Sequence, residues 1–175
     1  MSLNVGRVLL AQQTASADAS LDFDDVLSSD FDVFEIELIS VQPATDIVYL
    51  DCQLGVSGST YLGGASDYYW AVDRYGAGTF DAADTRIALT SDGTSAAASG
   101  NDANGGISGT IKVYGPTSSS RTHLVWALGA TTEANGFIPF QGCGMYNTAS
   151  STASIKFLFS SGNIASGTIK VYGVR

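Results

Sequence analysis

Hydrophobic and polar residues alternate with period two along several short segments of the chain. Between residues 33 and 41, Phe34, Ile36 and Leu38 alternate with two glutamates, which predicts a strand with one buried and one solvated face. Similar alternation marks the segments 48–54, 67–73, 86–90, 123–128 and 155–159. No long segment shows the period of an amphipathic helix. The pattern predicts an all-β fold, an antiparallel β-sandwich of jelly-roll-like type with about nine or ten strands.

The segments between these strands predict the connections. Pro43 and Asp46 separate the first two predicted strands, which favours a hairpin there. Residues 91–106 have almost no large apolar side chains, so we expect an exposed loop. Residues 129–154 mix aromatic residues with glycine and proline, which predicts a long packed loop containing a short strand around 137–140.

One octapeptide, Ser-Gly-Thr-Ile-Lys-Val-Tyr-Gly, occurs at 108–115 and again at 166–173. As a strand it places glycine, isoleucine and valine on one face and threonine, lysine and tyrosine on the other. A solenoid or propeller needs more copies than two. The repeat therefore predicts two equivalent strands, either neighbours in one sheet or related across two sheets. A pair of ligand-binding surface stripes is the alternative, and their residues would be Lys112, Tyr114, Lys170 and Tyr172.

Length and charge narrow the class of protein. A chain of 175 residues fits one domain, which we expect to span 1–175 with a short N-terminal arm over about 1–16. The net charge is −9, and all but one of the 17 acidic residues precede residue 105. Nucleic acid is therefore not an expected partner, because phosphate binding needs a cationic face. The apolar run after Arg7 is too short for a signal peptide, and no stretch predicts a membrane span, so we expect synthesis in the cytoplasm.

The two cysteines, Cys52 and Cys143, do not form a disulfide framework. Free and mostly buried thiols fit synthesis in a reducing cytoplasm, although spacing alone leaves a single bridge open.

An ordered set of short signatures resembles tailed-bacteriophage virion proteins and domains. The segments that carry the resemblance are 13–23, 31–38, 41–46, 66–71 and 155–173. The resemblance covers nearly the whole chain and implies a β-sandwich, often trimeric, located in the virion on heads, tails or fibres. It implies no catalytic residues.

These observations predict a capsid decoration or cement protein that stabilises the phage head by protein–protein contacts. The expected partners are the major capsid protein and further copies of the chain in a homotrimer. The chain carries no coiled-coil stalk, which fits a free-standing domain better than the end of a fibre. An acidic segment without lysine or arginine is the candidate capsid contact, and its members are Asp22, Asp24, Asp25, Asp30 and Asp32.

The alternative is a tail or fibre-tip adhesin that binds host surface glycan. Aromatic faces and neighbouring polar groups suit sugars, and the candidate residues are Tyr69, Tyr75, Asp73 and Arg74. The same region also reads as an ordinary strand whose alternate residues, Tyr68, Trp70 and Val72, face the core.

Enzymatic chemistry is not expected. His123 is the only histidine, and the chain has no Gly-x-Ser-x-Gly nucleophile motif. Glu35 and Glu37 lie about 7 Å apart along one strand, within the range for an inverting glycosidase, but such alternation is common on a solvated face. No cofactor or transition metal is expected. Calcium is left open by the acidic segment and by a second pair, Asp81 and Asp84.

Overall fold

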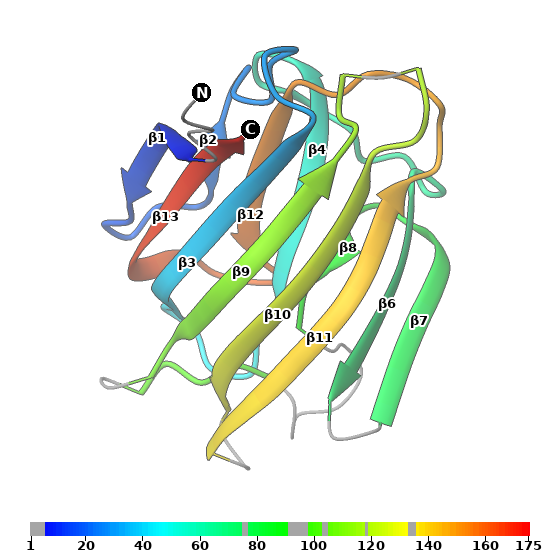
Figure 1. The fold of residues 1–175 in the computed structure, drawn as a ribbon. Helices are drawn as coiled ribbons and strands as arrows, with labels where there is room; N and C mark the ends of the chain where they lie inside the picture. The colour runs from blue at the N-terminus through cyan, green and yellow to red at the C-terminus, as the bar shows by residue number, and fades with distance from the viewer. Residues whose placement is uncertain (1–5, 75–76, 91–97, 103–104, 118, 133–135) are drawn as a thin grey trace.

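The computed structural model describes residues 6–74, 77–90, 98–102, 105–117, 119–132 and 136–175. Within these residues the chain is all-β, with 13 strands in two antiparallel sheets that pack against each other (Figure 1). The eight-stranded sheet has the order β1 (Arg7–Thr14), β13 (Ile164–Val174), β3 (Val33–Pro43), β9 (Ile107–Tyr114), β10 (His123–Thr132), β11 (Gly136–Tyr146), β6 (Tyr68–Arg74) and β7 (Ala77–Asp84). The second sheet has the order β2 (Leu21–Phe23), β12 (Ser154–Phe159), β4 (Leu50–Ser57) and β5 (Thr60–Tyr61), and β8 (Ile87–Ala88) also pairs with β4.

The predicted β-sandwich is confirmed, and the strand count is higher than expected. The additional strands are β1, β2, β5 and β7. Of these, β2 and β5 have only three and two residues and are too short to show an alternating pattern. In the described part of the chain, no helix is long and apolar enough to span a membrane.

The alternating segments place their apolar residues in one core between the sheets. Phe34 and Ile36 of β3 are fully buried, and Tyr68 of β6 is fully buried as well. The Tyr68 hydroxyl reaches across the sandwich and accepts a hydrogen bond of 2.8 Å from the backbone nitrogen of Leu54 in β4. Because this bond joins residues of opposite sheets, it fixes their relative position as well as satisfying buried polar groups.

The two copies of the octapeptide lie in β9 and β13, on either side of β3 in the same sheet (Figure 1). Their isoleucine and valine side chains are buried, and Lys112 and Lys170 lie on the outer face, as the alternation predicts. Gly109 and Gly167, the second residue of each copy, adopt φ values of 146° and 114°. Each presses against a neighbouring backbone, β10 for Gly109 and β3 for Gly167. The repeat therefore encodes the same tight strand contact twice.

Two predicted connections are wrong. The first two predicted strands do not form a hairpin, because β3 belongs to the eight-stranded sheet and β4 to the other. Residues 129–154 are not mainly a loop, because β10 continues to Thr132 and pairs with β11 along its whole length. A Cβ at position 142 of β11 would clash with the Trp126 ring, so packing requires glycine here. Glycine inside a segment ordinarily suggests a loop, and for that reason Gly142 is misleading in the sequence.

Three further expectations need correction. Residues 7–14 of the expected N-terminal arm form strand β1, which pairs with β13. Within the expected exposed loop, residues 98–100 are buried, and Ser99 bridges Val48 and Thr132. Residues 91–97 and 103–104 of that loop lie outside the described residues.

Both cysteines are free, but they lie in different surroundings. Cys52 is fully buried in β4, and desolvation raises the pKa of its thiol. Cys143 is exposed on the outer face of β11, whereas the sequence predicts mostly buried thiols. The difference follows from register, because Cys143 occupies an outward position of a strand that the sequence does not reveal.

Candidate binding face of the large sheet

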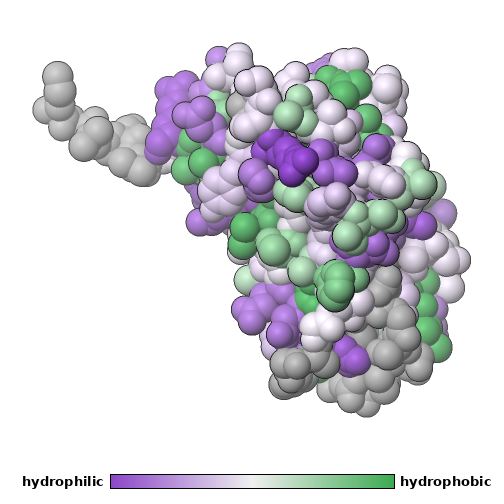
Figure 2. All heavy atoms as spheres, turned by 90° about the vertical axis from the view of Figure 1, so that its right-hand side faces the viewer, coloured by the Kyte–Doolittle hydropathy of each residue, from purple (hydrophilic) through white to green (hydrophobic). Residues whose placement is uncertain are grey.

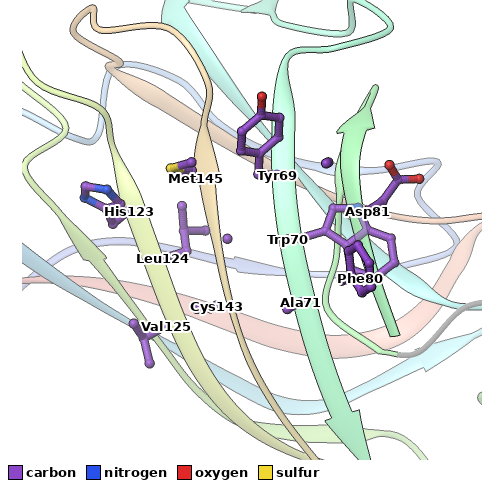
Figure 3. A pocket seen from close by; sticks show the side chains of 12 residues that line it. Tyr69, Trp70, Ala71, Phe80, Asp81, His123, Leu124, Val125, Cys143 and Met145 are labelled. Carbon is purple, nitrogen blue, oxygen red and sulfur yellow. The ribbon is translucent and has the colours of Figure 1, made fainter. Parts of the chain in front are cut away.

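A shallow groove crosses the outer face of the eight-stranded sheet at β10, β11, β6 and β7. Its larger section has a volume of about 640 Å³. The residues that line this section are Tyr69, Trp70, Ala71, Phe80, Asp81, Ala82, His123, Leu124, Val125, Cys143, Gly144 and Met145 (Figure 3). A second section continues along the same strands and shares four of these residues, Ala71, Phe80, Val125 and Cys143. We call the outer surface of these four strands the groove face.

Strand register creates the shape of the groove. Val125, Cys143, Ala71 and Phe80 are cross-strand neighbours in one row across β10, β11, β6 and β7. The small side chains in the middle form the floor. The larger ones form the walls, with Phe80 exposed to 78% and Val125 to 49%. Figure 2 views the side where Figure 1 places β6 and β7, and hydrophobic patches interrupt the hydrophilic surface there.

Two adjacent strands of the groove face, β10 and β11, carry no aspartate, glutamate, lysine or arginine along their whole length. Phe137 of β11, 67% exposed, extends the apolar surface at the far end. A solvated face of an antiparallel sheet normally carries polar side chains at its outward positions. Contiguous apolar surface of this kind is typical of an interaction site.

Few hydrogen-bonding side chains reach the groove. Tyr69, His123 and Asp81 stand around the larger section, and Figure 3 shows them coming from three different strands. Asp73 and Gln141 line the second section. Such a lining provides large apolar contact with a few polar groups to orient a partner.

The structure brings together part of the predicted glycan-binding set. Tyr69 and Asp73 occupy outward positions of β6 and line adjoining sections of the groove, at the same face as predicted. Arg74 is the last residue of β6, lies on the alternate side of the strand, and lines neither section. Tyr75 lies outside the described residues.

On the other half of the same outer face, charged and aromatic side chains replace the apolar ones. Arg7 of β1 binds Glu35 of β3, and its Nη1 lies 2.6 Å from Glu37 Oε1. The Tyr172 hydroxyl donates a 3.0 Å hydrogen bond to Glu37. Desolvation raises the pKa of Glu37, but the hydrogen bonds from Arg7 and Tyr172 outweigh it and hold this pKa below its ordinary value. Both glutamates are therefore engaged in a cross-strand ion-pair network.

The acidic segment forms a separate hollow beside β1 and β2. Four of its five predicted contact residues line the hollow, namely Asp22, Asp24, Asp25 and Asp30, and Asp32 is exposed outside the lining. Asp24 accepts a 2.7 Å hydrogen bond from the Tyr61 hydroxyl. Asp25 accepts one of 2.8 Å from the backbone nitrogen of Gly58. These two carboxylates hold the loop against the β4–β5 connection. Asp22 is half-buried with its Oδ1 buried, which leaves Asp30 and Asp32 as exposed acids of the segment.

Among the described residues, no three histidine, cysteine, aspartate or glutamate side chains form a group that could hold a metal ion. The second acidic pair is used within the fold. Asp84 accepts a 2.9 Å hydrogen bond from Trp70 Nε1, and Asp81 accepts one of 2.9 Å from the backbone nitrogen of Ala83.

The sequence patterns did not point to Phe80, Val125 and Cys143, although these residues shape the groove. They come from three segments, and only the sheet order brings them into one row. Between His123 and Tyr146 the sequence has no aspartate, lysine or arginine and only one glutamate, Glu133. This is the one sequence feature that could have indicated an apolar outer face.

Comparison of the chain with protein-family models, with curated proteins and with solved structures finds no match.

Proposed function

We propose that the chain is a non-enzymatic structural protein of a tailed-bacteriophage particle, a decoration protein that strengthens the capsid through protein–protein contacts. The observation that carries the proposal is the groove face, a largely apolar surface on which Phe80 and Val125 are exposed and Asp73 and Asp81 are the acidic lining residues. A surface of this kind suits packing against protein, because burial of apolar area supplies most of the free energy of association.

The acidic hollow supplies a second contact surface. It lies beside β1 and β2, at the opposite end of the molecule from β6 and β7 (Figure 1). A chain with a net charge of −9 is attracted to a basic protein surface, and exposed carboxylates at the rim determine the rate and orientation of docking. We therefore assign Asp30 and Asp32 to the surface that faces the capsid, leaving the groove face available for another contact.

The proposal predicts that the purified protein binds saturably to undecorated heads of its phage and raises the temperature at which they rupture. Replacing Asp30 and Asp32 with asparagine should weaken binding severalfold, because each exposed charge pair contributes about 0.2–1 kcal/mol. The loss should shrink as the salt concentration rises. Sedimentation with heads and thermal rupture are the measurements. Asp102→Asn, which removes one exposed charge elsewhere, should leave binding unchanged.

The proposal fails if the unmodified protein shows neither saturable binding nor any change in rupture temperature. If it binds but the Asp30/Asp32 variant binds equally well, the decoration role stands and the acidic contact is wrong.

A tail adhesin that binds host glycan is the second candidate. The observation in its favour is that Tyr69 and Asp73 face the same groove, where an aromatic ring and a carboxylate could contact a sugar. The sparse polar lining favours a protein partner instead, because sugars require many hydrogen bonds. A multivalent form of the protein on a glycan array distinguishes the two roles: binding that Tyr69→Ala abolishes would support the adhesin, and no binding would eliminate it.

A further inference from the structure

The groove face is broad, and its outward positions carry more apolar side chains than a solvated sheet face normally does. Four strands about 4.8 Å apart and about 30 Å long cover roughly 600 Å². The half of this area on β10 and β11 carries no charged side chain, and Asp73 and Asp81 lie on the other half. The whole face approaches the area of about 800 Å² that each partner contributes to a stable protein–protein interface. The dimensions match those of one side of a dimer.

Charge indicates which partner fits. Two copies of a chain with a net charge of −9 repel each other wherever acidic surfaces meet. On β10 and β11 the chain has no charged side chain, so copies can approach there without like-charge contact. A basic partner would gain nothing from such a face and would be drawn to the acidic hollow instead. The acidic side chains of the groove, Asp73 and Asp81, lie on β6 and β7, so a second copy that places β10 over β6 meets them with an uncharged strand.

We propose that the groove face packs against the groove face of a second copy of this chain, forming a two-fold symmetric dimer. This inference names the partner of the surface on which the proposed function rests. The row Val125–Cys143–Ala71–Phe80 supplies the contact. A two-fold axis parallel to β11 near Cys143 places the Val125 wall of one copy over the Ala71 floor of the other. The exposed side chain of each Phe80 is then removed from water and packs beside the Val125 wall of the other copy.

A dimer differs from the trimer that the resemblance to tailed-bacteriophage virion proteins implies. A face that binds itself across a two-fold axis gives pairs, and a trimer requires contacts between two different surfaces. Molar mass in solution therefore separates the two arrangements. Strands β1 and β2, which contribute to the lining of the acidic hollow, lie at the other end of the molecule from β6 and β7 (Figure 1). The hollow therefore remains open in the proposed dimer, and the same assembly can still dock on a basic surface.

Sedimentation equilibrium over a series from nanomolar to high micromolar concentration tests the proposal. The unmodified chain should approach twice its mass of 18.1 kDa as concentration rises. Val125→Glu should weaken the dimer at least about 100-fold, because it buries an unpaired charge at the contact. Val8→Glu is the matched control: Val8 is 46% exposed, against 49% for Val125, and lies in β1 at the far edge of the same sheet. This variant should dimerise like the unmodified chain.

A monomer at every concentration, a trimer, or a dimer that Val125→Glu leaves intact would each overturn the inference. Circular dichroism of both variants establishes that they are folded, and the concentration series of the unmodified chain decides the question even if a variant fails to fold. None of these outcomes depends on phage heads. If the chain does not dimerise, the proposed capsid role is still open to its own test. If the chain does not bind phage heads, the evidence for the dimer is unchanged.

Discussion

Replacing Gly167 with alanine is expected to lower the free energy of unfolding by about 3 kcal/mol or more. Its φ of 114° costs a non-glycine residue of the order of 1–3 kcal/mol. An added Cβ would also lie 2.5 Å from the Cα of Val41 and 2.6 Å from the carbonyl oxygen of Ser40. These are backbone atoms of β3, so neither can move without disturbing the sheet, and overpacking adds about 1–3 kcal/mol.

The same change at Gly109 should have a similar effect, since its Cβ would lie 2.3 Å from the carbonyl oxygen of Ala127 in β10. Chemical denaturation measures both variants. Gly58→Ala is the control, because Gly58 has a φ of 49° and open space around it and should cost only about 1 kcal/mol. Equal losses at Gly58 and Gly167 would show that the close strand contact contributes nothing and that the octapeptide is repeated for another reason.

Replacing Phe157 with alanine is expected to cost about 3–5 kcal/mol. Phe157 is fully buried in β12, the strand between β2 and β4, and its ring meets Phe23 edge to face at 6.3 Å. Alanine would leave a cavity in the layer between the sheets and remove the aromatic pair, which contributes about 0.5–1.5 kcal/mol beyond its buried area. This is a large share of the total stability of a domain, about 5–15 kcal/mol.

Phe80→Ala provides the matched comparison, because Phe80 is 78% exposed in the groove. At low protein concentration its free energy of unfolding should stay within about 0.5 kcal/mol of the unmodified value. Similar losses for the two phenylalanines in urea denaturation would contradict the assignment of Phe157 to the core and Phe80 to a surface that functions only in contact with a partner.

The side-chain pattern predicts which residues face the core, and the reason is geometric. Successive side chains of a strand point to opposite faces, so Phe34 with Ile36 and Tyr68 with Trp70 identify their buried faces without knowledge of the sheet order. The octapeptide behaves in the same way in both copies. Alternation does not specify which strands are neighbours, and for that reason the predicted hairpin between β3 and β4 is wrong.

The sequence does not predict the β10–β11 hairpin, because β11 contains residue types that usually mark a loop. Gly142 and Pro139 are unusual inside a strand and suggest a loop. In the folded sheet, Gly142 makes room for Trp126, and Pro139 lies at an outward position of β11. Packing between strands decides the structure here, and a single sequence does not contain that information in local form.

The candidate site was only partly predictable for a related reason. The outward position of Tyr69 follows from alternation, but its neighbours Val125 and Cys143 lie more than fifty residues away in sequence and reach it only through the sheet order. The acidic hollow was easier, since four of its aspartates come from one continuous segment. Even there, the structure shows that Asp24 and Asp25 hold the loop in place.

The reactivity of Cys143 shows whether protein covers the groove face when the chain is assembled. This exposed thiol lies in the middle of the groove face, whereas Cys52 is buried in the core and provides an internal reference. Maleimide labelling followed by mass spectrometry measures the reactivity of each thiol in dilute solution and in the assembled form. We expect rapid labelling of Cys143 in the dilute chain, strong protection on assembly, and labelling of Cys52 only after denaturation. Equally rapid labelling of Cys143 in both states would show that the groove face stays uncovered.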